Sequence, residues 1–142
     1  MIREYGDSDI EDVLEVWLRA SRVAHPFLSE EFLTAEREAI YNVHMPEAQS
    51  WVCEEDGEVV GFIALMGSEV GAIFVDPEKQ GQGIGRALMD TARTLHETLE
   101  LEVFEANHIG RSFYDKYGFV VISQHVHEES GQPALRMRYD PQ

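Results

Sequence analysis

The spacing of apolar residues predicts two helices in the first third of the chain. A short strand at residues 2–5 comes first, and Ser8 followed three residues later by Glu11 is typical of a capping box. The apolar positions that follow lie on one helical face: Ile10, Val13, Leu14 and Trp17.

A second helix is expected after a break at residues 25–28. The sequence His25-Pro26-Phe27-Leu28 interrupts the first helix, because proline lacks the N–H that a continuing helix needs. Ser29 is placed to cap the next helix. Its apolar positions again have helical spacing: Phe32, Ala35, Ala39, Ile40 and Val43.

From Ser50 onward the pattern changes to strands. Apolar runs at residues 51–53 and 59–66 flank Asp56-Gly57, a strong hairpin signal, and a third run at 70–75 follows a Gly67-Ser68 turn. These runs predict an antiparallel meander.

The last part of the chain alternates helices and strands. We expect a long helix through Ile84, Leu88, Thr91, Ala92 and Leu95, and a buried strand at residues 101–105. A short helix at 109–117, ended by Gly118, and strands at 119–126 and 134–139 follow. The order predicts one α/β (α+β) domain over residues 1–142, with a mixed, mostly antiparallel twisted sheet of about seven strands and about four flanking helices.

The charge balance narrows the possible partners. The chain has 27 acidic and 11 basic side chains and a net charge of −16, so its field repels nucleic acid and anionic membranes and attracts amines, although acidity also serves solubility. The single cysteine, Cys53, fits a reducing compartment and excludes a multi-cysteine metal site. No apolar run is long enough to cross a bilayer and the first residues are polar, so we expect a cytoplasmic protein.

A glycine-rich turn between a strand and a helix carries the main chemical signal. Gly81, Gly83 and Gly85 alternate just before the helix, where backbone amides without neighbouring Cβ atoms can converge. The positive end of the helix dipole adds to this cradle, which therefore favours an anion despite the acidic field of the protein. Tight packing is the alternative reason for such glycines.

The spacing of the glycines indicates which anion. A Rossmann turn needs glycine or alanine where Arg86 stands, and the Gly-Lys-Ser/Thr of a P-loop is absent. Gln-x-x-Gly-x-Gly, formed by Gln80, Gly83 and Gly85, resembles the acyl-CoA-binding turn of the GNAT superfamily of N-acetyltransferases. Residues 72–77 are similar to the central strand of that family, and Asn107 and residues 113–119 to its later cofactor-binding and proton-donating segments. The predicted order of elements also matches along essentially the whole chain.

The resemblance implies acetyl-CoA as co-substrate. Main-chain groups of the central strand would line the pantetheine and the amides of the turn would hold the pyrophosphate, while Arg86 either adds a charged contact or is an ordinary solvated helix residue. The implied cofactor-binding residues are Ile73, Phe74, Val75, Gln80, Gly81, Gln82, Gly83, Ile84, Gly85, Arg86 and Asn107.

The chemistry requires a deprotonated amine and a proton for the departing thiolate. An aliphatic amine has a pKa of about 10.4, so a base or a water relay must remove its proton. An amide near Val75 is expected to stabilise the oxyanion. The resemblance assigns the proton donor to Tyr114, whose alternative role is a core aromatic beside Phe113; Tyr117 is expected to pack near Gly118.

The general base stays open between a water relay and several side chains. The candidates are Glu69, Glu105, His25, His44 and His108. His25 with Phe27 is alternatively a wall of the acceptor pocket. We expect no metal, because His125 and His127 on one strand face are more typical of exposed polar residues, and Cys53 next to two glutamates is disfavoured as an acetyl carrier.

The predicted function is therefore acyl-CoA-dependent N-acetyl transfer. The acceptor is a primary amine of a small molecule or a protein, attacking directly in a ternary complex. The alternative is a non-catalytic acyl-CoA sensor or interaction module, and a nucleotide- or phosphate-binding protein is a third reading. The sequence contains no motif that selects the acceptor, the acyl chain or the oligomeric state, monomer or homodimer.

Overall fold

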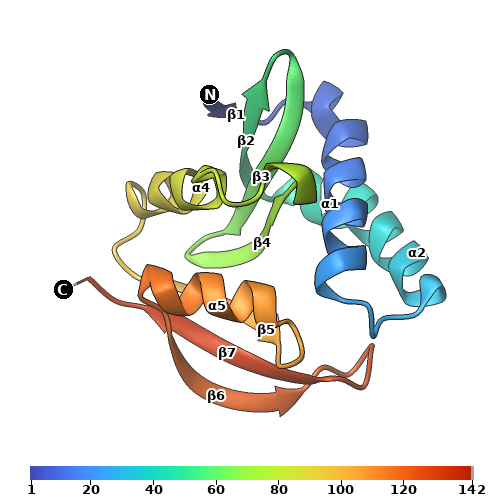
Figure 1. The fold of residues 1–142 in the computed structure, drawn as a ribbon, viewed down its shortest axis with the longest axis vertical. Coiled ribbons are helices and arrows are strands. Elements are labelled where there is room, and N and C mark those ends of the chain that lie inside the picture. Colours follow the sequence, from blue (N-terminus) through green and yellow to red (C-terminus); the bar gives the residue numbers. More distant parts are fainter. Residues whose placement is uncertain (142) are drawn as a thin grey trace.

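A single sheet with helices on both faces organises the molecule (Figure 1). The computed structural model describes residues 1–141. Within them the sheet has seven strands in the order β1-β2-β3-β4-β5-β7-β6, and every neighbouring pair except β4 and β5 is antiparallel. The strands are β1 Ile2–Glu4, β2 Gln49–Glu55, β3 Glu58–Met66, β4 Glu69–Val75, β5 Leu99–Phe104, β6 Val120–Val126 and β7 Pro133–Tyr139. The predicted mixed, mostly antiparallel sheet is confirmed.

The longer helices form two pairs on opposite sides of the sheet (Figure 1). They are α1 Ile10–Ala24, α2 Glu30–Ala39, α4 Ile84–Arg93 and α5 His108–Tyr117. Shorter helical pieces lie between strands and helices: 3₁₀ turns at Asp7–Asp9 and Pro77–Lys79, a π-helical turn at Ile40–His44 and α3 at Met45–Glu47. No helix within residues 1–141 is both long and apolar enough to cross a membrane.

Strand β3 separates two apolar cores. Ile63 and Leu65 point to the core beneath α4 and α5, whereas Phe62 and Ala64 point to the core beneath α1 and α2. Successive side chains of a strand face opposite sides, so a strand buried on both faces is apolar throughout. This explains the unbroken apolar run that predicted β3 from the sequence.

The helix boundaries test the predicted capping residues. Ser29 caps α2 as expected, since its hydroxyl accepts a bond of 3.0 Å from the N–H of Phe32. The capping box at Ser8 and Glu11 is wrong, because α1 begins at Ile10 after a 3₁₀ turn and Asp9 occupies the cap position. Leu95 is also outside its predicted helix, which ends at Arg93 and leaves the Leu95 side chain 46% exposed.

The Asp56-Gly57 hairpin forms as predicted. Both residues have positive φ, 52° and 79°, and they join β2 to β3. Two positive φ angles are the mark of the tight turn that matches the twist of paired strands.

The sheet opens between β4 and β5. These parallel strands pair only at Glu69 with Glu100 and at Val70 with Leu101. Beyond that point they diverge, so residues 71–75 of β4 have a partner strand on the β3 side alone. The opening exposes main-chain N–H and C=O groups in the centre of the sheet, where an extended ligand can bond to them.

Arg136 on β7 holds the joint at the base of this opening. The facing residues of β4 and β5 there are both acidic, Glu69 and Glu100. The guanidinium of Arg136 donates to both carboxylate oxygens of Glu69 at 2.7 and 2.8 Å and to Glu100 at 3.0 Å. It thereby replaces a repulsion between like charges with a bidentate ion pair.

Arg136→Met is expected to lower the free energy of unfolding by about 1–2 kcal/mol, because two facing carboxylates lose their shared cation. The matched control is Arg22→Met, whose pair with Glu30 is exposed on both sides and should contribute less than about 0.5 kcal/mol. Urea denaturation of both variants measures the difference, and equal losses would show that Arg136 does not hold the joint.

Candidate active site

A cavity of about 1110 Å³ passes through the opening between β4 and β5. Its lining comes from both faces of the sheet: the glycine turn, β4 and α5 at one end, and α1, α2 and the start of the β6–β7 connection at the other. The divergence of two neighbouring strands therefore connects two pockets that would otherwise be separated by the sheet.

The glycine turn has the conformation that its sequence predicted. Gly81 and Gly83 have φ angles of 83° and 84°, and a Cβ at either position would project into open space. These glycines are therefore needed for the backbone conformation of the turn, because residues with a Cβ disfavour positive φ. Gly85 differs: a Cβ there would lie 3.2 Å from the ring of Phe113, so this glycine lets α5 pack against α4.

The first turn of α4 is available to an anion. Gly83 occupies the cap position and no side chain caps the helix. The N–H groups of Ile84, Gly85 and Arg86 therefore point toward the cavity end without a side-chain acceptor within residues 1–141, and the helix dipole adds positive potential there. Gln82 lies in the turn between the two positive-φ glycines.

Gln80 shapes the turn through its side chain. Its Nε2 donates a bond of 3.2 Å to the carbonyl of Val75, which ties the turn to the end of β4. Its predicted contact with the cofactor stays a prediction, because the structure shows the amide engaged with the protein itself.

The open edge of β4 presents main-chain groups to the cavity. The N–H of Asp76 bonds to the carbonyl of Val60 on β3. Along an antiparallel strand, the main-chain groups of successive residues point alternately toward and away from the paired strand. The N–H and C=O of Ile73 and Val75 therefore face away from β3, toward the opening. Phe74 instead directs its main chain to β3 and its ring against Phe62, with centroids 5.8 Å apart.

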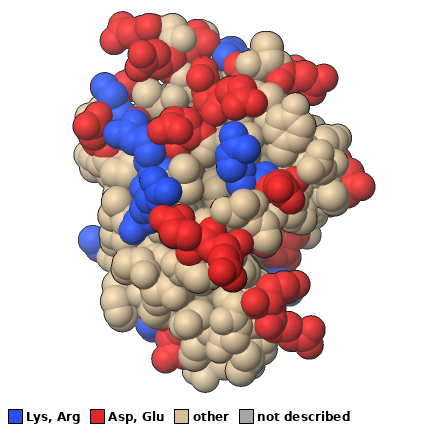
Figure 2. Space-filling view, turned by 90° about the vertical axis from the view of Figure 1, so that its right-hand side faces the viewer, with Lys and Arg blue, Asp and Glu red and all other residues tan. Residues whose placement is uncertain are grey.

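The glycine-turn end of the cavity is basic although the protein is acidic. Lys79, Arg86 and Lys116 line this end, and the guanidinium of Arg86 lies 5.7 Å from the ring centroid of Tyr117. By contrast, the face that carries α1 and α2 shows acidic side chains interleaved with fewer basic ones (Figure 2). The basic residues at the turn give a polyphosphate a local attraction that the net charge opposes.

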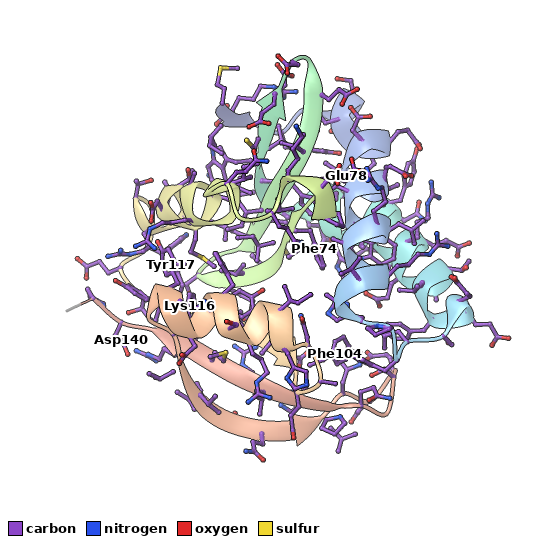
Figure 3. All side chains as sticks on the ribbon, in the orientation of Figure 1. Phe74, Glu78, Phe104, Lys116, Tyr117 and Asp140 are labelled. Atoms are coloured by element: carbon purple, nitrogen blue, oxygen red, sulfur yellow. The ribbon has the colours of Figure 1, made fainter. Side chains whose placement is uncertain are left out.

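Tyr114 and Tyr117, three residues apart on α5, have different surroundings. Tyr114 lines the cavity and is packed against Phe113 and Phe119, and burial raises the pKa of its hydroxyl well above the usual value. Tyr117 points to α4 (Figure 3), where its hydroxyl donates a bond of 2.6 Å to Asp90. Of the two, only the Tyr114 side chain lines the cavity.

His25 forms part of the cavity wall between the diverging strands. Its ring contacts Phe74 of β4 and Phe104 of β5, with centroid distances of 6.4 and 5.1 Å. Figure 3 shows these two phenylalanines on either side of the opening. Burial lowers the pKa of His25 to about 4, so the ring is neutral at physiological pH.

Asn107 fixes the orientation of His25. Its Nδ2 donates to Nε2 of His25 at 3.1 Å, and its Oδ1 accepts from the N–H of Gly110 at 2.9 Å, which caps α5. Asn107 lines the cavity but is only 7% exposed. Its amide is thus occupied within the protein, and a direct contact with the cofactor remains a prediction.

The structure shows which of the candidate general bases are available to act in the cavity. Glu69 is bound by Arg136, and Nε2 of His25 accepts from Asn107. Glu105 and His108 are exposed and do not line the cavity, whereas His44 does. Of these candidates, His44 alone combines two properties. It lines the cavity, and its imidazole forms no side-chain hydrogen bond with the residues that the structure describes.

Sequence reasoning missed Glu36. It lines the cavity from α2, between the buried residues Leu33 and Ile40. Burial raises the pKa of its carboxyl, and His44 and His127 act in the opposite direction. Glu36 is three residues after Leu33 and four before Ile40, which places it on the buried face of the predicted helix. An acidic residue on a buried face is unusual, and this was the signal in the sequence that could have identified it.

The histidines of the β6–β7 region have local partners. His125 bonds to Glu102, and Nδ1 of His127 lies 2.8 Å from the Ser130 hydroxyl. In the part of the chain that the structure describes, no group of three or more His, Cys, Asp or Glu side chains is arranged to hold a metal ion.

Comparisons with known proteins agree with this geometry. The family model of the acetyltransferase (GNAT) domain matches residues 5–141. The chain is 34% identical to peptidyl-lysine N-acetyltransferase YiaC of Escherichia coli (strain K12), over 98% of this chain and 96% of that protein. It is 37% identical to peptidyl-lysine N-acetyltransferase YjaB of Salmonella typhimurium, over 93% of this chain and 91% of that protein. The solution structure of apo YjaB from Escherichia coli superimposes with a TM-score of 0.88 at 32% identity, over 100% of this chain and 98% of that one.

His25→Gln should remove part of the pH dependence of stability. The pKa of His25 falls from 6.5 unfolded to about 4 folded, so the unfolded chain binds more protons in this window and wild-type stability falls by up to about 3 kcal/mol as the pH drops from 6.5 to 4. Urea denaturation across that range checks this. The exposed control His108→Gln should keep the wild-type slope, and an unchanged slope in His25→Gln would contradict the buried, neutral ring.

Proposed function

The chain belongs to the GNAT family of acetyltransferases, and on that premise we propose that it acetylates the ε-amino group of lysine side chains in proteins. The chain is an acyl-CoA-dependent N-acetyltransferase; the lysine acceptor is suggested by relatives that are peptidyl-lysine N-acetyltransferases and that match nearly the whole chain. The observation that carries the proposal is the continuous cavity from the glycine turn to an acidic end beneath α2. Its two ends suit a polyphosphate and a cationic acceptor respectively.

We assign the grip on acetyl-CoA to main-chain groups. The uncapped amides of the first turn of α4, with Gly81 and Gly83 in positive φ, suit the pyrophosphate. The N–H and C=O groups of Ile73 suit the pantetheine amides, which can bond to the open edge of β4 as a further strand would. Arg86 adds charge beside the turn, whereas Nζ of Lys79 is paired with Glu55 at 3.7 Å.

The same edge suits the acyl-transfer step. The amine attacks the thioester carbonyl, whose oxygen gains negative charge that the N–H of Val75 is placed to stabilise. The C–S bond then breaks and the thiolate leaves with a proton from Tyr114, while the proton lost by the attacking nitrogen passes through a base or a water relay and restores the Tyr114 hydroxyl. A tyrosine hydroxyl is protonated at neutral pH, as a proton donor must be, and burial raises the pKa of Tyr114 further.

Gly83→Ala is expected to weaken acetyl-CoA binding about tenfold or more, because the strained φ of 84° would distort the anion cradle. The control is Gly57→Ala in the β2–β3 hairpin, where φ is 79° and the added Cβ also meets open space. Both variants should lose about 1 kcal/mol of stability. Calorimetry with acetyl-CoA should separate them, and equal affinities would remove the turn from the binding site.

Tyr114→Phe should lower kcat by about a hundredfold or more while the affinity for acetyl-CoA stays within about twofold, because only the proton donor is lost. The control Tyr117→Phe loses the bond to Asp90 and should keep the rate. Mass spectrometry of blocked peptides with one lysine measures acetylation. Unaltered turnover in Tyr114→Phe would refute its role, and acetylation of polyamines or aminoglycosides in preference to the peptides would refute the protein acceptor.

A further inference from the structure

We propose that Glu36 recognises the acceptor: its carboxylate first binds the ammonium group of the incoming lysine at the cavity end beneath α2, before the nitrogen loses its proton and moves to the thioester. This inference rests on the proposed function, since it names the group that selects the substrate of the same site. Three observations on the Glu36 side chain support it: its position on the cavity wall, its carboxylate without an ion-pair partner among residues 1–141, and the residues that surround it.

The charged residues that line the cavity are divided between its ends. Those at the glycine turn and on α5 are basic: Lys79, Arg86 and Lys116. Those beneath α2 and on β5 are acidic: Glu36 and Glu102. A cavity with this division attracts a polyphosphate at one end and a cation at the other, and it disfavours the reversed arrangement.

Of the two acidic residues, Glu36 is the one whose carboxylate is free. Glu102 is already bonded to His125. The arginines of α1 and α2 are likewise engaged: Arg19 with Asp76, Arg22 with Glu30 and Arg37 with Glu11. Among residues 1–141, no Lys, Arg or His forms an ion pair with Glu36, although it is half-buried. A half-buried carboxylate without a cation gains most from one that arrives with the substrate.

The helix fixes where this carboxylate points. Leu33 and Ile40, one turn on either side of Glu36, are 4% and 8% exposed and belong to the core beneath α1 and α2. Because these anchors prevent α2 from rotating, Glu36 keeps its place on the cavity wall. The neighbouring residue Glu38 is exposed and lies outside the lining.

Aromatic rings beside Glu36 suit the apolar stem of lysine. The ring of His127 contacts Phe32 of α2 and Phe104 of β5, with centroids 5.9 and 5.1 Å apart, and all three residues line the cavity. A lysine side chain buries its methylene groups against such surfaces while its charged end seeks an anion. Recognition of a long amine follows, in preference to a short one.

The charged neighbours of Glu36 explain why a cation is favoured there. His44 of the π-helical turn and His127 lower the pKa of Glu36, Glu129 of the β6–β7 connection raises it, and burial, which also raises it, is the largest effect. An ammonium group bound beside it would replace lost solvation of the charged form. Acceptor binding is therefore expected to strengthen as the pH rises and Glu36 ionises.

Steady-state kinetics with a blocked peptide that contains one lysine tests the assignment. Glu36→Gln should raise KM for the peptide about tenfold or more, because a hydrogen bond between charged groups is lost, and leave KM for acetyl-CoA within about twofold. Glu36→Asp should recover part of the affinity. The control Glu38→Gln removes the same charge two residues away and should leave both constants within about twofold of wild type. Equal effects of Glu36→Gln and Glu38→Gln, or a rise in KM for acetyl-CoA, would overturn the proposal.

A binding measurement separates this inference from the proposed function. Protein saturated with coenzyme A is titrated in a calorimeter with the lysine peptide and with the same peptide carrying norleucine. Wild type should bind the lysine peptide at least about tenfold more tightly, and Glu36→Gln should lose this preference. No preference in wild type would overturn the role of Glu36. A normal preference without acetylation of the peptide would instead count against the proposed function.

Discussion

The divergence of β4 from β5 is the constraint on which the site depends. Two residue pairs hold the strands together, and beyond them the inner edge of β4 has no partner strand. Unpaired main-chain groups inside a sheet are costly unless a ligand bonds to them. The opening is tolerated because its base is held by Arg136 and because His25 packs against Phe74 and Phe104 at its wall.

Fixed dipoles allow an acidic protein to bind a polyanion. With a net charge of −16, side chains alone would repel acetyl-CoA, but the uncapped amides of α4 and three basic residues act at short range at one end of the cavity. The overall field favours a cationic acceptor at the other end. In the proposed function, the two substrates are thus distinguished by the charge at each end of the cavity.

Burial adjusts the ionisable groups around the opening in different ways. It keeps Tyr114 protonated, His25 neutral and the pKa of Glu36 raised. The first suits a proton donor, the second suits a wall of the cavity whose ring nitrogen is held by Asn107, and the third suits a group that awaits a cation. Burial in one low-dielectric space thus shifts three pKa values in directions that suit the three proposed roles.

Local patterns in the sequence determined most elements and the anion cradle. Ser29, Asp56-Gly57 and the glycine turn were predicted because capping and positive φ depend on near neighbours. The Ser8 cap failed because Arg3 binds both Asp9 and the distant Glu54 and so fixes Asp9 at the start of α1. The family resemblance had already favoured Tyr114 over Tyr117 as the proton donor, but only the tertiary structure engaged Asn107 with His25 and brought Glu36 into the cavity. These depend on contacts between residues far apart in the chain, which one-dimensional spacing does not encode.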